Sequence, residues 1–300
     1  MLDIQNLTPN AKVDWFMEPS SSSNECYTWN KPSGCNFVYI LAVGGGGCGG
    51  GGLAGVSGSS RGGGSGGGSG AIATLLVPEF LITDTLFINV GLGGVATTTG
   101  SILAAPTIVS AYRVFSATEY YLYANAGGNG NIGTTANAVG GAAGAASAIT
   151  ACPLGSVGIF KSFAGITGST GGTPSFAGTD ASLTYFLSGA AGGGGILSPG
   201  ALKAGGNVTS SYASTLPTII SGGNISTDPN GNSGIFIPKR FAFFGGAGGA
   251  SSNGIGGNGG NGAPGCGGGG GGAGLDSGFG LGTSGFGGNG GNGFVMIVSY

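Results

Sequence analysis

One segment of the chain has the residue types of a phosphate-binding loop. Residues 37–43 form an apolar run, and the next four positions, 44–47, are all glycine. Such a loop cradles a phosphate when a helix begins at the glycines and an acidic residue follows about 20 positions later. Neither feature is present here, and no lysine follows a G-x-x-x-x-G pattern. We therefore expect no nucleotide and no other cofactor.

The residues needed for enzyme catalysis are sparse. The chain contains no histidine, which excludes the Ser-His-Asp and Cys-His arrangements, and its 10 acidic residues are dispersed. The 5 cysteines lie at no metal-ligand spacing, so we expect no metal site. Cys26 and Cys35 either close a small loop or remain free thiols used as small apolar residues. We expect a protein that is not an enzyme.

The charge and hydropathy patterns exclude further classes. With 8 basic residues, a net charge of −2 and no basic cluster beyond Lys239-Arg240, the chain lacks the surface of a nucleic-acid-binding protein. No apolar run reaches the roughly 18 to 20 residues of a membrane span. The N-terminus lacks a basic start followed by an apolar core, so we expect synthesis in the cytoplasm without a signal peptide.

Short runs of β-branched and aromatic residues, bounded by Gly, Asn, Ser or Pro, predict an all-β fold. The run 37–43 has no alternation, which indicates a strand that is buried on both faces or central in its sheet. No segment predicts an amphipathic helix. The other predicted strands are 71–78, 86–90, 108–115, 120–124, 182–187, 234–244 and 294–300.

Glycine supplies 75 of the 300 residues and often recurs with a period of three. Residues 256–274 can be written in triplets that begin with glycine, and 287–293 repeat Gly-Gly-Asn. Three residues per turn is the period of a polyproline-II helix, which makes no internal hydrogen bonds. We therefore expect sheets of a β-sandwich or jelly-roll-like type, joined to glycine-rich segments packed as a sheaf of polyglycine-II-type helices.

Residues 1–25 differ from the rest because they contain no glycine, and we assign them to an N-terminal arm ahead of a glycine-rich β domain at 26–300. The arm carries Trp15 and Phe16. Two interpretations remain open: these side chains dock on a partner subunit, or the arm is a first strand that covers the edge of a sheet.

A recognition surface is predicted between the last two triplet runs. Asp276, Phe279 and Phe286 lie in or beside a glycine-flanked loop with no obvious core to enter. Aromatic side chains on a rigid base are typical of recognition surfaces. The alternative is that the two phenylalanines cap the sheaf against water.

Four elements in order resemble the glycine-rich domain of bacteriophage tail-fibre and adhesin proteins. They are Tyr27-Thr28-Trp29-Asn30-Lys31-Pro32-Ser33-Gly34 with the strand and glycines 37–47, Ile88-Asn89-Val90-Gly91-Leu92-Gly93-Gly94, Gly171-Gly172-Thr173-Pro174-Ser175-Phe176, and Gly290-Gly291-Asn292-Gly293 before the last strand. This resemblance implies a virion component, with polyglycine-II helices that expose recognition loops at one end.

These observations lead to one expected function and two alternatives. The expected function is a non-enzymatic virion surface protein that attaches to a host cell-surface receptor or glycan and contacts other virion proteins. The alternatives are a purely structural virion subunit and a non-viral matrix or filament protein. Because few charges protect the strand edges, we expect a homo-oligomer, and fibre proteins suggest a trimer by analogy.

Overall fold

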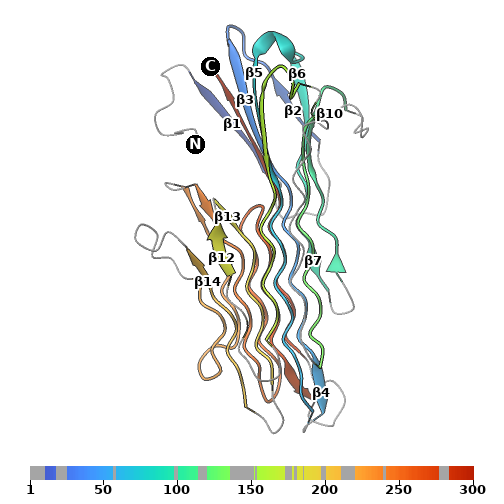
Figure 1. Ribbon diagram of the computed structural model, residues 1–300, viewed down its shortest axis with the longest axis vertical. Helices are drawn as coiled ribbons and strands as arrows, with labels where there is room; N and C mark the ends of the chain where they lie inside the picture. Colours follow the sequence, from blue (N-terminus) through green and yellow to red (C-terminus); the bar gives the residue numbers. More distant parts are fainter. Residues whose placement is uncertain are drawn as a thin grey trace.

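The computed structural model shows an elongated molecule with β-sheets at one end and long glycine-rich segments at the other (Figure 1). It describes residues 11–17, 26–56, 59–97, 101–113, 120–135, 152, 154–172, 178, 181–184, 186–196, 201–210, 220–238, 241–276 and 284–300. The described part is all β, with no α-helix, and it includes the 3-10 turn η2 (Glu79–Leu81). The predicted fold class is confirmed.

Two sheets form a β-sandwich at the upper end in Figure 1. The larger sheet has the order β1-β18-β3-β5-β11, with β1 at Lys12–Met17, β18 at Phe294–Ser299, β3 at Phe37–Val43, β5 at Ile72–Pro78 and β11 at Ile159–Phe163. The smaller sheet has the order β10-β9-β6-β2, with β10 at Tyr120–Ala124, β9 at Thr107–Ser110, β6 at Thr85–Asn89 and β2 at Cys26–Asn30. All neighbouring pairs in both sheets are antiparallel.

The core between the two sheets is made of their inward-facing apolar side chains. Ile40, Leu75 and Ile297 of the larger sheet and Leu86 and Leu122 of the smaller sheet are all fully buried in one cluster. Alternate positions of a strand point to opposite faces. The other face of the larger sheet is therefore free to build a second core.

That second core explains why residues 37–43 show no alternation. Leu41 and Val43 pack on the far face of β3 with Phe243 and Leu187, which come from smaller sheets beside the sandwich. The strand is both buried on its two faces from Ile40 onward and central in its sheet. The smaller sheets are β13-β12-β14, β15-β16, β17-β4 and β7-β8. Their strands are β12 (Ala181–Thr184), β13 (Leu187–Ser188), β14 (Val208–Ser210), β15 (Phe236–Ile237), β16 (Ala242–Phe243), β4 (Ala54–Val56), β17 (Gly274–Asp276), β7 (Val95–Ala96) and β8 (Ser101–Ile102).

Five of the eight predicted strands occur within two residues of their expected bounds, and three need correction. The strand predicted at 108–115 ends at Ser110, where residues 111–113 form a bend. The predicted strands 182–187 and 234–244 are each a tight hairpin, β12-β13 and β15-β16. In the second hairpin the chain turns after Pro238, where the amide of Phe241 bonds to the Pro238 carbonyl and Phe241 has a φ of 51°. Several short strands, among them β4, β14 and β17, were not predicted. The longer strand β11 was also not predicted, although its residues alternate between more and less exposed positions.

The strands of the sandwich continue directly into glycine-rich segments, which we call rods. The rods are residues 44–53, 62–71, 125–134, 164–172, 189–195, 244–250, 256–262, 266–273 and 285–293, and together they form the sheaf (Figure 1). Strand partners remain partners in the sheaf. For example, Val43 of β3 faces Ile72 of β5, and beyond this pair the amide of Gly47 bonds to the Gly68 carbonyl.

Rod 62–71 shows how the sheaf is bonded. All ten of its backbone amides donate to carbonyls of neighbouring segments, at 2.7–3.0 Å. Every third amide addresses the same neighbour: one series reaches 125–134, the next 166–172 and the third 265–271. A period of three in the hydrogen-bond partners is the geometry of a polyproline-II-type helix with its amides satisfied by neighbours.

Glycine is required because the rods touch backbone to backbone. A Cβ atom added at Gly46 would lie 2.0 Å from the Cys266 carbonyl oxygen, and one at Gly270 would lie 2.1 Å from the Gly64 oxygen. Small residues also reach the interior: Cys48, Ala191 and Ala247 are fully buried there, as are Ser65 and Ser69. Their hydroxyls accept hydrogen bonds from the amides of Asn131 and Ile166, both at 2.7 Å.

The long triplet run at 256–274 is two rods and not one. A turn at residues 263–266 folds the chain back, with the Cys266 amide bonded to the Ala263 carbonyl at 2.9 Å. Pro264 fixes its own φ, and Gly265 has a φ of 74°, which suits the third position of a type II turn. The returning rod pairs with the first, as in the bond from the Gly269 amide to the Gly260 carbonyl.

The asparagines of the triplets lie at the surface of the sheaf. The Oδ1 atom of Asn258 accepts the Phe286 amide, and the Oδ1 atom of Asn261 accepts the Asn289 amide, both at 2.9 Å. On an exposed rod, an asparagine side chain therefore accepts the amide hydrogen bond. In a buried rod, a backbone carbonyl of a neighbouring rod accepts it. This explains why asparagine recurs at the third place of the triplet on the exposed rods.

We expect the substitution Gly67→Ala to lower the free energy of unfolding by about 1–3 kcal/mol, the usual cost of overpacking. Its Cβ would lie 2.1 Å from the Gly47 carbonyl oxygen, so two rods must separate. Gly254→Ala is the control, because there the nearest atom is the Ser252 Oγ at 3.9 Å. Denaturant unfolding of both variants checks the prediction, and equal stabilities would contradict it.

Candidate functional site at the turn end of the sheaf

The rods reverse at the end of the molecule farthest from the sandwich, where β4 is labelled in Figure 1. Here β4 and β17 pair in parallel, with Gly274 opposite Ala54 and Asp276 opposite Val56. The amide of Leu275 also bonds to the Gly254 carbonyl at 3.0 Å, so a third connection joins the pair. We call this region the turn end.

A buried arginine holds the turn end together. Arg61 is only 2 % exposed, and its Nη1 donates to the carbonyl oxygens of Gly55 and Gly274, the latter at 3.0 Å. Its backbone exchanges two hydrogen bonds with Ile196, at 2.8 and 2.9 Å. One residue therefore connects three chain segments.

The charge of Arg61 is poorly compensated. Its Nε has no hydrogen-bond partner, and no carboxylate in the described ranges forms an ion pair with it. Burial lowers the pKa of the guanidinium from its usual value, although an arginine stays protonated at neutral pH. A buried cation that bonds only to carbonyl oxygens is a brace for the backbone, and its low exposure keeps it out of reach of a ligand.

Apolar side chains are exposed on the connections around this brace. Val56 is 61 % exposed, Ile255 69 % and Phe286 45 %. Val56 ends β4, Ile255 follows Gly254, and Phe286 begins the rod that returns from the turn end. We call these three residues the turn-end patch. Exposed apolar side chains on hydrogen-bonded connections can bind a partner without a large loss of conformational entropy.

Two of the three predicted recognition residues lie in the described part of the chain. Asp276 is the last residue of β17, and Phe286 belongs to the turn-end patch. Phe279 lies outside the described residues. Sequence reasoning missed Val56 and Ile255 because it considered only aromatic residues in glycine-flanked loops. Ile255 stands alone between Gly254 and Gly256, so a search for any large apolar residue flanked by glycine would have found it.

The structure places Trp15 and Phe16 in the edge strand β1, which pairs with β18. The Trp15 ring lies 5.8 Å from the ring of Phe241 and 5.9 Å from that of Phe294, and the Phe16 ring lies 5.9 Å from that of Tyr27. Residues 12–17 therefore cover a sheet edge, as one of the two interpretations expected. Trp15 is still 40 % exposed.

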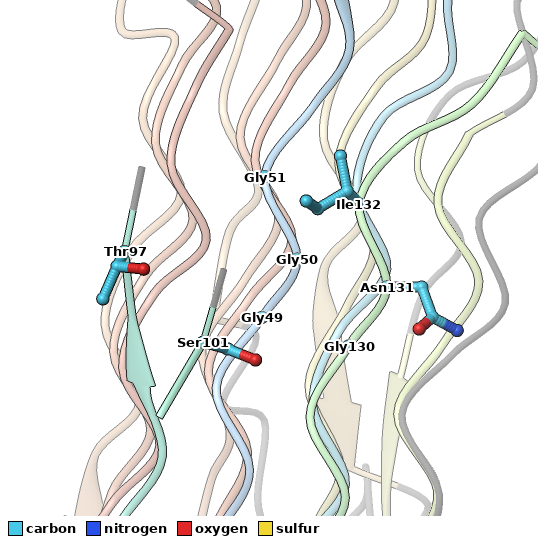
Figure 2. A pocket seen from close by; sticks show the side chains of 8 residues that line it. All are labelled: Gly49, Gly50, Gly51, Thr97, Ser101, Gly130, Asn131 and Ile132. Atoms are coloured by element: carbon cyan, nitrogen blue, oxygen red, sulfur yellow. The ribbon is translucent and has the colours of Figure 1, made fainter. Parts of the chain in front are cut away.

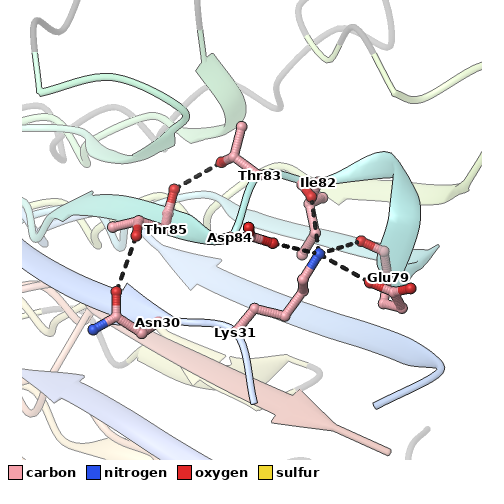
Figure 3. Close-up of polar contacts among 7 residues, drawn as sticks. All are labelled: Asn30, Lys31, Glu79, Ile82, Thr83, Asp84 and Thr85. Carbon is pink, nitrogen blue, oxygen red and sulfur yellow. Dashed lines mark hydrogen bonds and ion pairs between the residues drawn. The ribbon is translucent and has the colours of Figure 1, made fainter. Parts of the chain in front are cut away.

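A second exposed aromatic, also missed from the sequence, lies at the opposite end of the molecule. Phe80 in η2 is 74 % exposed. Figure 3 shows how Lys31 fixes this turn: its Nζ lies 2.9 Å from Glu79 Oε2 and 3.0 Å from Asp84 Oδ1, and it donates to the Glu79 carbonyl at 3.1 Å. The hydrogen bond to Glu79, followed by that to Asp84, raises the pKa of Lys31.

The groups at both ends can make contacts but suggest no reaction. In the described part of the chain, no three residues among His, Cys, Asp and Glu are grouped so that they could hold a metal ion. The five cysteines are free thiols, and burial raises the pKa of Cys266 to about 12, which keeps it protonated and unreactive at neutral pH. No helix in the described ranges is long and apolar enough to cross a membrane.

The comparison with known families gives one match. Residues 21–300 match a family described as a glycine-rich domain. The matched region begins just before β2 and ends at the last residue, so it includes the sheaf and all of the sandwich except β1. The search of curated proteins found no match.

We expect Arg61→Met to destabilise the protein by about 1–3 kcal/mol, because the carbonyls of Gly55 and Gly274 lose a charged donor. Arg113→Met, at an exposed position, is the matched control. Denaturant unfolding measures the loss, and amide exchange at Leu275 locates it. A stability equal to that of the control would show that Arg61 is not a brace.

The ion pairs of Lys31 predict a loss of stability at high pH. Because the folded-state pKa is raised, the contribution is complete below the unfolded-state pKa of about 10.4 and disappears as the pH rises through the folded-state value. The difference in unfolding free energy between the wild type and Lys31→Met should therefore be constant from pH 7 to 9 and shrink above about pH 10.5. Denaturant unfolding across this range tests it, and an unchanged difference at pH 11.5 would contradict it.

Proposed function

This chain belongs to the glycine-rich domain family, and we propose that it is a non-enzymatic attachment protein of a virus particle. In this proposal the β-sandwich faces the particle and the turn-end patch contacts a receptor or glycan on the host cell surface. The observation that carries the proposal is the exposure of Val56, Ile255 and Phe286 at the turn end, where Arg61 braces β4 and β17.

The sheaf provides the rigidity that such a role needs. Each buried rod is hydrogen-bonded along its length to several neighbours, as rod 62–71 shows. The patch therefore stands on a base that loses little freedom when a partner binds, which reduces the entropic cost of association. The sheaf also holds the patch at a distance from the sandwich (Figure 1).

The assignment to a bacteriophage tail fibre or adhesin rests on the resemblance of four sequence elements. The first of these lies in β2 and β3 with the following rod, and the last in the rod that leads into β18. These two elements are junctions between strands and rods. We propose that the resemblance reflects the same construction, with recognition loops at the end of the rods.

The edges of the larger sheet support a role for the sandwich in contacts with other virion proteins or with further copies. Both edge strands carry exposed apolar side chains: Trp15 on β1, and Ile159 and Phe163 on β11, with exposures of 40, 60 and 38 %. Unprotected edges favour association. We propose that Trp15 and Phe16 take part in such a contact, and that the protein is a homo-oligomer, with a trimer suggested by analogy alone.

The purely structural alternative is favoured by the same edges. A subunit that serves only to pack would use β1 and β11 and would not need the turn-end patch. The two functions therefore differ in which end of the molecule makes the functional contacts: the turn end for attachment, and the sandwich for packing. Substitutions at opposite ends can separate them.

We expect labelled protein to bind host cells, and Phe286→Ser to weaken this binding at least tenfold, about 1.4 kcal/mol. Phe80→Ser is the matched control, because Phe80 is also an exposed phenylalanine but lies at the other end. Flow cytometry on a panel of bacterial cells measures the binding. Failure of the wild type to bind any cell, together with assembly into closed oligomers, would favour the structural alternative.

A further inference from the structure

Rod 44–53 lies beside the β7-β8 hairpin for only part of its length. Near the sandwich, the Gly45 amide donates to the Ala105 carbonyl at 3.1 Å, and the Gly46 carbonyl accepts the Gly94 amide at 2.8 Å. These bonds join two faces of the rod to the segments on either side of the hairpin. Here both faces of the rod have hydrogen-bonded neighbours.

Farther along, the same two faces open into a groove of about 250 Å³ (Figure 2). Its floor is the backbone of Gly49, Gly50 and Gly51, and Thr97, Ser101 and Ile132 are among the residues that line it. Because the rod has three residues per turn, the Gly49 carbonyl points in the same direction as the Gly46 carbonyl. The Gly51 amide likewise points in the same direction as the amides of Gly45 and Cys48. Within the described residues, neither of these two groups has a hydrogen-bond partner.

The groove thus lies along the same faces of rod 44–53 that the segments beside the hairpin cover nearer the sandwich. It offers one backbone acceptor and one backbone donor on a floor without side chains, and no charged residue lines it. These are the same backbone groups that bind a neighbouring rod elsewhere in the sheaf. A charged ligand would find no opposite charge, because the side chains that line the groove belong to Thr97, Ser101, Asn131 and Ile132. A peptide backbone would find both of its hydrogen-bonding partners in the floor.

We propose that this groove binds an extended, glycine-rich segment of another polypeptide in the polyproline-II conformation. The segment adds a rod to the sheaf, with its carbonyl on the Gly51 amide and its amide on the Gly49 carbonyl. It must be glycine at every third position, because neighbouring rods elsewhere leave no room for a Cβ, as at Gly49 and Gly50, where the nearest oxygens would lie at 1.9 Å. This inference does not depend on host attachment.

The chain offers a substitution that fills the groove without disturbing the sheaf. A Cβ added at Gly51 meets only the Gly285 carbonyl oxygen, at 3.4 Å, which is an ordinary contact distance. Gly51→Val therefore places methyl groups in the groove while the rods stay in contact. Gly254→Val is the control, because Gly254 is exposed, its Cβ would also be unhindered and it does not line the groove.

The experiment measures binding of a fluorescent synthetic peptide, GGNGGNGAPG, to the full chain by anisotropy. The sequence is that of residues 256–265, which form a rod and its turn in the sheaf. We expect saturable binding to the wild type and to Gly254→Val, and at least tenfold weaker binding to Gly51→Val. A second peptide with valine in the first place of every triplet should not bind. Thermal unfolding confirms that both variants are folded.

Three results would overturn the proposal. They are no binding of the peptide to the wild type at millimolar concentration, equal binding to Gly51→Val, and equal binding of the valine peptide. Sedimentation of the wild type and Gly51→Val tests whether a second copy of the chain occupies the groove instead. Self-association that Gly51→Val abolishes and the peptide does not inhibit would assign the groove to a second copy of the chain and would also overturn it.

Discussion

Peptide groups in the sheaf bond directly to peptide groups of neighbouring rods, and the absence of Cβ atoms is the condition for this contact. A glycine loses more conformational entropy on ordering than other residues and buries no side chain. The compensation here is a complete set of backbone hydrogen bonds, ten of ten amides in rod 62–71. Because a threefold rod points its peptides in several directions, one rod can bond to neighbours all around it, whereas a strand bonds only within its sheet.

At the junction between sandwich and sheaf, hydrogen bonding between strands of a sheet changes to hydrogen bonding between threefold rods. Strands β3, β5 and β18 are neighbours in the larger sheet, and the rods that continue them keep the same antiparallel pairing. Side chains end where the rods begin, as at Val43 followed by Gly44. The sandwich therefore fixes the register of the sheaf by burying apolar side chains, and the sheaf extends that register by hydrogen bonds alone.

This division keeps most side chains out of the interior of the sheaf. Contacts are therefore made by the turn-end patch, by the sandwich, by side chains on the surface of the sheaf, such as Asn258 and Leu103, or by backbone at a gap in the packing. Arg61 and Lys31 perform similar tasks at opposite ends, since each holds a connection by donating to carbonyl oxygens. The groove beside Gly49 and Gly51 is the place where backbone itself is available.

The sequence alone determined the local structure. Runs of β-branched and aromatic residues located β3 and β10 with their observed bounds, and the triplet period indicated threefold rods, because both depend on spacing along the chain. Only the tertiary structure decided which segments are neighbours. Ile255 and Phe286 reach the same end, Pro264 and Gly265 fold one run into two rods, and Gly51 is left open where Gly50 is enclosed. A glycine carries no side chain by which its sequence could specify a partner, so its surroundings are set by the strands and turns that position the rod.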